Sequence, residues 1–406
     1  MRVLHINTTT TGGAARAVFR LHRGLRSQGV ESRMLVEQKK GNDASIFGSE
    51  GLTGKVKSRI RREIDQLPLK RYLNRKPEIF SPAWTPEWRA KQIARHDPDI
   101  VHLHWIGGGF MRPETISQIN VPIVWTLHDM WPFTGGCHVS NSCTKYQESC
   151  GACPHLASTK RTDLANSVWT RKQIAWEENT FNLIAPSRWI ASCAEKSSLF
   201  SGQPITVIPN GLNTNLFRPH PSGVFREQLD VDPSEDLVCF GSSHQAQYKG
   251  YDLLHAALYQ LVDRTDSIKL LSFGAKPKKN ILSNIPVKHL GYLEGSSLHE
   301  LYSDADVIVV PSRKESFGQM ASEALASGTP VVAFDATGLQ DIVEHKKTGY
   351  LAEPYDPKAL AEGIMWVLEE NKKSHRMSKR ARRSAQREFA IENVVDHHLK
   401  LYNELV

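Results

Sequence analysis

The sequence lacks long apolar runs: no stretch reaches the roughly 18 consecutive apolar residues that a membrane-spanning helix needs. It contains no low-complexity tract, and residues 3–7 form a strand pattern where a secretory signal would carry an apolar core. The composition, 40% hydrophobic and 23% charged, is ordinary for a globular protein. We therefore expect a cytoplasmic chain. Because 406 residues exceed what one hydrophobic core usually organises, we also expect two domains.

A recognisable nucleic-acid-binding module is also missing, although the chain is basic. The formal net charge is +8 and the pI about 9.1, which suits nucleic acid, an anionic membrane or a phosphorylated substrate. The basic residues gather in two runs, 55–76 and 372–387, and neither belongs to such a module, so we expect no nucleic-acid partner. Gly12 and Gly13 do not complete the G-x-G-x-x-G fingerprint, which argues against a dinucleotide-dependent oxidoreductase.

Short apolar runs alternate with helical patterns, which is typical of parallel α/β layers. The predicted strands are 3–7, 32–36, 100–104, 123–126, 183–185 and one from 205, followed by 237–241, 268–273, 287–290, 307–311 and 330–334. Helices are predicted at 251–263, 297–303 and 319–327. Two such series indicate two Rossmann-like, doubly wound domains with a ligand cleft at the carboxyl ends of the strands. We expect domains at 1–205 and 206–387, and an amphipathic helix in 388–406 that packs back on the first domain.

The most informative stretch spans residues 311–333. After a strand, a loop carries Glu315 and Gly318, and a helix that begins near Gln319 carries Glu323. Loop amides at such a helix N-terminus can bind a phosphate or sugar hydroxyls. Two carboxylates in these places can bind two polyol regions of one ligand. For isolated glutamates, the alternative is that both are solvated charges beside a helix.

The spacing Glu-x7-Glu, followed by Ala-Ser-Gly-Thr-Pro-Val-Val, resembles the donor-site signature of retaining GT-B glycosyltransferases of family 4. The resemblance implies two facing Rossmann-like domains with an interdomain cleft, and transfer of a sugar from a UDP- or GDP-sugar with retention of configuration. It also implies that Glu315 contacts the transferred sugar, that Glu323 binds the ribose, and that catalysis requires no cofactor. The amides implied to lie near the sugar and diphosphate are those of Ser316, Phe317, Gly318, Gln319 and Met320.

Residues 248–252 resemble the Lys-Gly element of the same family. This implies that Lys249 is a cation facing the diphosphate, a role that suits a compact ammonium and stabilises the leaving group electrostatically. Many family members place an arginine shortly before this lysine, and none is present here. We expect Ser242, Ser243 or His244 to substitute through hydrogen bonds.

Two segments of the first domain carry further candidates. Gly12 and Gly13 match the glycine loop that the family places near the donor phosphates or the acceptor, although a glycine pair can also be a simple turn. His128 follows a predicted strand, and the resemblance implies that it touches the donor sugar or the acceptor hydroxyl. A hydrogen-bonded core histidine is the alternative. Asp129 is a candidate to orient this imidazole or to act on the acceptor. Our candidate catalytic residues are thus His128, Lys249 and Glu315.

Four of the six cysteines gather in one loop: Cys137, Cys143, Cys150 and Cys153. In a cytoplasmic protein such a cluster indicates a metal or redox site before structural disulfides. We expect a closed structural zinc site, which leaves no position for catalysis. Free or reversibly oxidised thiols and an iron–sulfur cluster are the alternatives. The cluster resembles an insert in family members that make exopolysaccharides such as colanic acid.

Eight of the nine tryptophans precede residue 190, and aromatic faces suit sugar rings, although most tryptophans in strands belong to the core. We place Trp105 and Trp131 beside a saccharide acceptor, and expect a role in exopolysaccharide or other surface polysaccharide biosynthesis. Residues 55–76 space Val56 and Ile60 helically among basic residues. Such a helix either lies on an anionic membrane, at its cytoplasmic face, and presents a polyprenyl-diphosphate-linked acceptor, or packs on the first domain.

Two alternatives stay open on these residues. A GT-B sugar-nucleotide epimerase would bind the nucleotide sugar but need no second sugar. A basic zinc-containing nucleic-acid-binding protein, from a different class, would explain the net charge and the cysteines without the donor-site motif.

Overall fold

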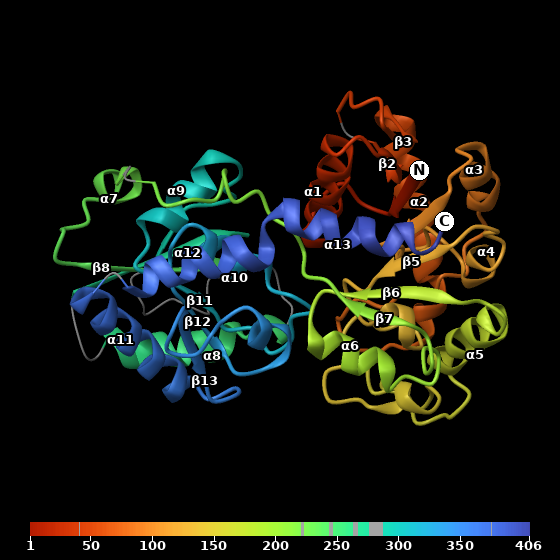
Figure 1. Cartoon of the computed structure of the whole chain (residues 1–406). Coiled ribbons are helices and arrows are strands. Elements are labelled where there is room, and N and C mark those ends of the chain that lie inside the picture. The colour runs from red at the N-terminus through yellow and green to blue at the C-terminus, as the bar shows by residue number, and fades with distance from the viewer. Residues whose placement is uncertain (40, 221–222, 243–246, 263–266, 276–286, 375) are drawn as a thin grey trace. The chain divides into compact units, whose positions relative to one another are not determined.

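The computed structural model describes residues 1–39, 41–220, 223–242, 247–262, 267–275, 287–374 and 376–406 (Figure 1). The chain divides into two compact units. The first comprises residues 1–209 and 394–406, and the second comprises 210–393. The sequence placed these two divisions at 205/206 and 387/388. No helix among the described ranges is long and apolar enough to cross a membrane.

The first unit is built on a seven-stranded parallel sheet in the order β3-β2-β1-β4-β5-β6-β7. Its strands are β1 (Arg2–Asn7), β2 (Glu31–Gln38), β3 (Ile46–Ser49), β4 (Ile100–Leu103), β5 (Ile123–Thr126), β6 (Phe181–Ala185) and β7 (Ile205–Val207). Its α-helices are α1 (Gly13–Ser27), α2 (Gly51–Gln66), α3 (Arg89–Arg95), α4 (Pro113–Ile116), α5 (Leu164–Trp176), α6 (Arg188–Glu195) and most of α13 (Ile391–Asn403). Short 3₁₀ turns are η1 (Leu67–Arg71), η2 (Trp131–Phe133) and η3 (Lys145–Gln147).

The two faces of this sheet differ in chemistry because side chains alternate along a strand. Leu4 and Leu103 join a large apolar core that contains Trp125. On β1 and β4 the intervening positions carry His5 and His102, both completely buried. A polar layer therefore occupies the second face of the sheet.

The second unit is built on a six-stranded parallel sheet in the order β10-β9-β8-β11-β12-β13. Its strands are β8 (Asp236–Ser242), β9 (Ile268–Gly274), β10 (Val287–His289), β11 (Val307–Val310), β12 (Val331–Phe334) and β13 (Gly349–Ala352). Its helices are α7 (Val224–Gln228), α8 (Tyr251–Val262), α9 (Ser296–Asp304), α10 (Gln319–Ala326), α11 (Pro357–Lys373) and α12 (Arg376–Phe389), with 3₁₀ turns η4 (Gln247–Lys249) and η5 (Thr337–Asp341). Apolar clusters pack on both faces of this sheet, as expected of a doubly wound domain.

The α/β class and the predicted strands are confirmed to within about two residues at most ends. Two strands were missed, β3 and β13, and each lies at an edge of its sheet. Their burial explains this, since β3 buries only Ile46 and β13 buries only its two terminal residues. A strand with so few buried positions carries little periodic signal.

Candidate functional site

The second unit brings two chain segments together where its strand order reverses. β8 and β11 are neighbours, η4 follows β8, and residues 311–318 follow β11. Gly250, with φ +67°, approaches this loop so closely that a Cβ built on it would lie 1.8 Å from the carbonyl oxygen of Pro311. The backbone N–H of Arg313 donates to the carbonyl of Tyr248 at 2.7 Å. Such a reversal, at the carboxyl ends of parallel strands, is where doubly wound sheets bind ligands.

This approach pairs the two charged candidates of the motif. Lys249 Nζ donates to Glu315 Oε1, and the two side chains are 26% and 18% exposed. The Ser312 hydroxyl donates to the same oxygen at 3.1 Å, and the Glu315 N–H donates to the Thr337 hydroxyl at 3.2 Å. Burial lowers the pKa of Lys249, but the Glu315 carboxylate more than offsets this, so the pKa lies above its ordinary value. The ammonium is therefore charged at neutral pH.

Beside this pair, Gly318 caps the N-terminus of α10. Its φ is +111°, and a Cβ there would lie 2.7 Å from Leu339 Cδ2, so glycine is required by both conformation and space. Phe317 turns its ring into the core, 5.6 Å from the ring of Phe389, while Ser316 and Gln319 are half-buried. Residues 316–319 thus lead into the first turn of an eight-residue helix. The first N–H groups and the dipole of this helix favour an anion.

Glu323 lies on the buried side of α10 and is 1% exposed. The hydroxyl of Tyr302, itself buried, donates to Glu323 Oε2 at 3.1 Å. The structure therefore engages this carboxylate inside the unit, and its contact with a ribose stays a prediction.

The expected substitutes for the missing arginine are only partly described. Ser242 ends β8, whereas Ser243 and His244 lie outside the described residues. Arg313, which was not predicted from the sequence, donates two hydrogen bonds of 2.6 Å from its guanidinium to the carboxylate of Asp252. This arginine comes from the loop after β11. Its place in the motif, two residues before the first glutamate, is the signal that could have found it.

In the first unit, candidates lie after β1, β4 and β5, where that sheet also reverses its order. Gly12 has φ +96° and caps α1, and a Cβ at Gly12 or Gly13 would meet no atom within 4 Å. Conformation rather than crowding therefore requires glycine at the first of these positions. Asn7 Oδ1 accepts a hydrogen bond from the N–H of Trp105 at 2.9 Å, which ties the end of β1 to the end of β4.

His128 follows β5 and is half-buried. Its Nε2 lies 3.0 Å from Nδ1 of His104, the residue that follows β4. Burial lowers the pKa of His128 to about 4, against an opposing effect of Asp129. His128 is thus a neutral imidazole at neutral pH, with one donor and one acceptor nitrogen and no charge.

Asp129 organises the loop that follows. Its Oδ2 pairs with Nδ1 of His138 at 2.6 Å, and its Oδ1 accepts from the N–H of Trp131 at 2.9 Å. Burial raises the pKa of Asp129, but the nearby His138 outweighs it, so the carboxylate stays charged. Trp131 is 2% exposed and donates from Nε1 to the carbonyl of Ser81. Its ring therefore packs inside the unit and does not, as we expected, lie beside an acceptor. Trp105 is half-buried, with Nε1 at 3.2 Å from His138 Nδ1.

The four clustered cysteines line one small cavity together with His155. They form no disulfide. Burial raises the pKa of Cys137 and Cys153, and that of Cys150 to about 12, so these thiols are protonated without a metal. Within the described ranges, no three of the sulfurs lie within 4.8 Å of one another. A zinc ion would have to draw them together and displace their protons, and the zinc site stays a prediction.

A buried cation adjoins the cysteine cavity. Lys172, on α5, is completely buried and donates from Nζ to the carbonyls of Trp131 and Thr134. Its ammonium nitrogen lies 3.7 Å from the centroid of the Trp131 ring. Burial lowers its pKa to about 7, against an opposing effect of the Asp129 carboxylate. Its position on a helix carried no signal, because a lysine there ordinarily extends into solvent.

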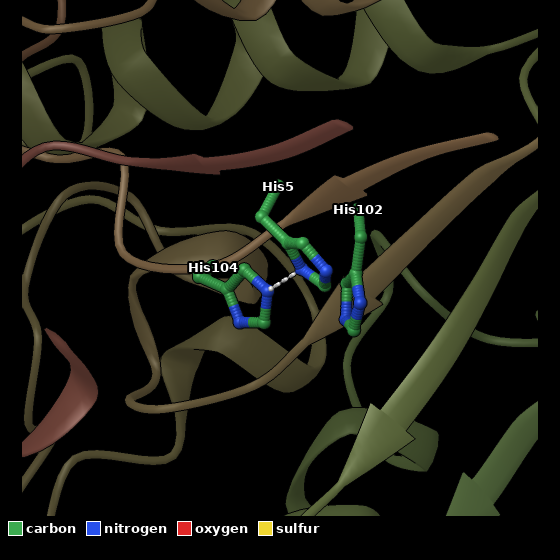
Figure 2. Close-up of side chains that lie close together, drawn as sticks. All are labelled: His5, His102 and His104. Carbon is green, nitrogen blue, oxygen red and sulfur yellow. Dashed lines mark hydrogen bonds between the residues drawn. The ribbon is translucent and has the colours of Figure 1, made fainter. Parts of the chain in front are cut away.

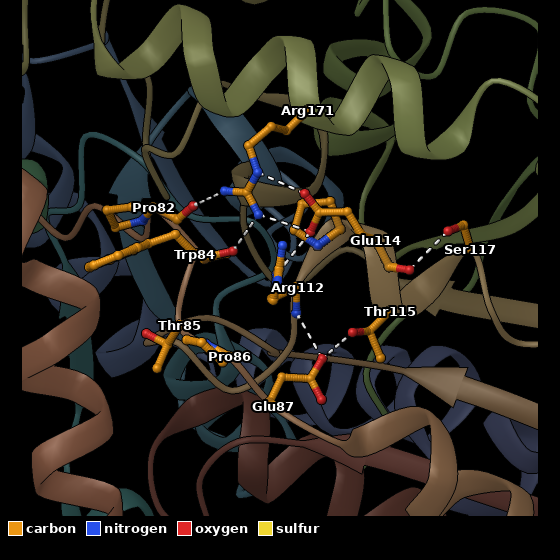
Figure 3. Close-up of polar contacts among 12 residues, drawn as sticks. Pro82, Trp84, Thr85, Pro86, Glu87, Arg112, Glu114, Thr115, Ser117 and Arg171 are labelled. Atoms are coloured by element: carbon orange, nitrogen blue, oxygen red, sulfur yellow. Dashed lines mark hydrogen bonds and ion pairs between the residues drawn. The ribbon is translucent and has the colours of Figure 1, made fainter.

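A polar network fixes the segment 82–87, which contains Trp84 (Figure 3). Arg171 donates to both carboxylate oxygens of Glu114 at 2.8 and 2.9 Å, and to two carbonyls of the segment at 3.1 and 2.9 Å. Trp84 is 39% exposed and Trp88 is 70% exposed. Among tryptophans of the first unit, these two present ring surface that a sugar could cover.

The apolar side of α2 faces away from the unit. Val56 and Ile60 are 55% and 52% exposed, whereas Gly54, Ser58 and Asp65 are buried. The apolar stripe therefore does not pack on the first unit. Basic residues accompany it on the helix, namely Lys55, Lys57, Arg59, Arg61 and Arg62.

Comparison with known proteins bears on both units. Residues 11–216 match the family model described as Glycosyltransferase Family 4, and residues 224–384 match the one described as Glycosyl transferases group 1. The first match covers slightly more than half of the chain. The chain belongs to glycosyltransferase family 4. The predicted membership of this family is thereby confirmed.

Relatives support the same family at moderate identity. An uncharacterized glycosyltransferase of Methanocaldococcus jannaschii is 30% identical over 210 residues, which cover 49% of this chain and 53% of that protein. The chain thus spans about half the length of that relative. A D-inositol 3-phosphate glycosyltransferase of Thermobispora bispora is 26% identical over 310 residues, 71% of this chain and 67% of that protein.

Among solved structures, the Anabaena protein HepE in complex with UDP and glucose matches with a TM-score of 0.69 and 18% identity. The match covers 100% of both chains. Together with the two parallel, Rossmann-like sheets, it shows that the chain has the GT-B fold.

Proposed function

We propose that this glycosyltransferase moves a sugar from a UDP- or GDP-sugar to a saccharide or lipid-linked saccharide, with retention of configuration, in surface polysaccharide biosynthesis. The observation that carries the proposal is the Lys249–Glu315 pair beside the glycine-capped N-terminus of α10. A cation and helix N–H groups suit a diphosphate, and a carboxylate suits sugar hydroxyls. HepE, which shares the fold, was solved with UDP and glucose, which supports UDP as the first donor to test.

In this proposal the charged groups serve the departing diphosphate. Breaking the sugar–phosphate bond leaves negative charge on the diphosphate, and a fixed ammonium at Lys249 stabilises that charge without reorganisation. Glu315 then contacts hydroxyls of the transferred sugar, and the neutral imidazole of His128 contacts a hydroxyl of the donor or acceptor. These residues supply the steps without a metal or an organic cofactor.

The acceptor side of the proposal rests on the exposed surface of the first unit. Trp84 and Trp88 offer aromatic faces for a saccharide. The exposed stripe of Val56 and Ile60 among lysines and arginines fits an anionic lipid surface, from which a polyprenyl-diphosphate-linked acceptor would be presented. Because a relative is named for D-inositol 3-phosphate, the acceptor panel should contain a phosphorylated polyol as well as saccharides.

The ion pair allows a test in which binding and turnover move in opposite directions. Without a donor, Glu315 neutralises part of the charge on Lys249, so Glu315→Gln leaves that charge to the nucleotide. We expect Glu315→Gln to bind UDP or GDP about fivefold more tightly, roughly 1 kcal/mol. Sugar transfer should fall about 100-fold, because the sugar contact is lost. Lys249→Met should weaken nucleotide binding about tenfold.

Calorimetry with UDP, GDP and ADP and their sugars measures the binding, and product formation with added acceptor measures the transfer. Glu362→Gln is the control, because Glu362 lies on α11, is 52% exposed and is not part of the pair. This variant also loses one negative charge, and it should change neither nucleotide binding nor sugar transfer. Unchanged nucleotide affinity in both site variants, with intact folding, contradicts the proposed donor site. Turnover of a nucleotide sugar without any acceptor would instead favour the epimerase, and salt-dependent retention of DNA would favour the nucleic-acid-binding protein.

A further inference from the structure

Three imidazoles share the polar face of the first sheet. His5 on β1 and His102 on β4 are register partners, and His104, two residues further, lies on the same face because strand residues alternate. Their side chains are 0%, 0% and 3% exposed. Figure 2 shows the three rings side by side. A single buried histidine is satisfied by two hydrogen-bond partners, one for each ring nitrogen. Three buried histidines side by side therefore need a further explanation.

Two hydrogen bonds link this layer to the candidate site. Nδ1 of His5 lies 3.0 Å from Nε2 of His104, and Nδ1 of His104 lies 3.0 Å from Nε2 of His128. Both nitrogens of His104 are therefore used. The resulting chain His5–His104–His128 runs from the interior to the half-buried residue that follows β5.

Neutral imidazoles in such a chain cannot choose their tautomers independently. Burial lowers the pKa of His5 and His104 well below the ordinary value and that of His128 to about 4, so each ring carries one N–H. Each hydrogen bond needs one donor and one acceptor. If His104 donates from Nδ1, it must accept at Nε2, and the reverse. Only two arrangements satisfy both bonds: all three rings protonated on Nε2, or all three on Nδ1.

We propose that His104 and His5 are positioning residues, which hold the ring of His128 and couple its tautomer to theirs. A substrate hydroxyl that needs a donor or an acceptor at His128 then selects one of the two collective arrangements. Exchange between the two arrangements brings no net charge into the sheet, because each ring gains one proton and gives up another. This inference rests on the role of His128 in the proposed function and names the groups that orient it.

A metal ion is the other ligand chemistry that three neighbouring imidazoles suit. One nitrogen from each of His5, His102 and His104 lies within 4.8 Å of the others. However, His102 already uses both nitrogens, with the Tyr402 hydroxyl at 2.6 Å and the Thr126 hydroxyl at 2.7 Å. Of the six imidazole nitrogens of His5, His102 and His104, only Nε2 of His5 lacks a hydrogen-bond partner. A metal would break bonds that the hydrogen-bonded layer already satisfies.

Two amide substitutions separate the two halves of the chain. In His104→Asn the amide lies near the former Nδ1 and can still partner His128, whereas in His104→Gln it lies near the former Nε2 and partners His5. We expect kcat/KM to fall about tenfold in His104→Gln, or about 1.4 kcal/mol, and about threefold or less in His104→Asn. His22→Asn is the matched control: His22 is equally buried and bonded, to Ser32 and Ser45, and should lose stability without losing kcat/KM.

Nitrogen NMR of protein labelled at histidine reads the tautomers directly, without donor or acceptor. We expect His5, His104 and His128 to share one tautomer in the wild type, and the tautomer of His128 to change in His104→Gln but not in His22→Asn. Different tautomers among the three rings, equal kcat/KM in the two His104 variants, or a metal whose content falls in His102→Asn would each overturn the inference. Because this measurement needs no donor, a failed donor site leaves the NMR result intact and is thereby distinguished.

Discussion

Gly250→Ala tests whether a single close approach positions the Lys249–Glu315 pair. A Cβ at this position would lie 1.8 Å from the Pro311 carbonyl oxygen and 2.9 Å from its carbon, so the loop after β11 must retreat by about 1 Å or more. The left-handed φ of +67° adds about 1–2 kcal/mol for any residue with a Cβ, and the crowding adds about 1–3 kcal/mol. We expect a loss of about 2–5 kcal/mol in the free energy of unfolding. The same retreat separates Lys249 from Glu315, and misplacement on this scale costs about 100-fold in turnover.

Gly291→Ala supplies the matched control. Its φ is +75°, and a Cβ there meets no atom within 4 Å, so it carries the backbone cost alone. Urea unfolding followed by circular dichroism compares the two variants, and calorimetry with UDP or GDP compares their binding. Equal unfolding free energies in Gly250→Ala and Gly291→Ala would refute the clash. A destabilised Gly250→Ala with full turnover would refute its role in positioning the pair.

Three further predictions concern the first unit. Burial lowers the pKa of Lys172 to about 7, so between pH 7 and 10 the unfolded state binds more protons, and the wild type should gain stability relative to Lys172→Met as pH rises, by at most about 1.4 kcal/mol per unit in urea unfolding. Elemental analysis should find one zinc per chain, lost in Cys153→Ser and retained in Cys239→Ser; a metal-free, folded wild type contradicts the zinc site. Ile60→Ser should weaken sedimentation with anionic vesicles, whereas Ile174→Ser, 69% exposed on α5, should not.

Strands and the donor-site motif could be predicted from the sequence because both depend on local pattern. β5 and β11 are four-residue strands buried throughout, which a continuous apolar run announces. Lys249 and Glu315 are 66 residues apart, and only the resemblance to a family placed them at one ligand. Their direct ion pair required the packing at Gly250, which no spacing shows.

Other features could not be predicted because they depend on which face of an element is buried. The periodicity of α2 shows an apolar side but not its direction. At Gly54 an added Cβ would lie 3.0 Å from Ser49, and Asp65 accepts from the N–H of Trp84, so the small and polar side packs inward. Trp131 was misplaced for the same reason, since a tryptophan after a strand fits a core and a site equally well. The histidine chain depends on strand register across nearly 100 residues of sequence.

The candidate residues of the two units differ in charge. The difference follows from the partners that each side chain finds at the carboxyl ends of its sheet. Lys249 stays charged although half-buried, because a carboxylate lies against it. His128 stays neutral, because burial outweighs the opposing effect of Asp129, whose carboxylate is held by His138. Transfer from a nucleotide sugar needs a permanent cation at the departing diphosphate, but only a directed, uncharged hydrogen bond at a sugar hydroxyl. In the proposed function, a charged Lys249 therefore suits the departing diphosphate, and a neutral imidazole at His128 suits a hydroxyl of the donor or acceptor.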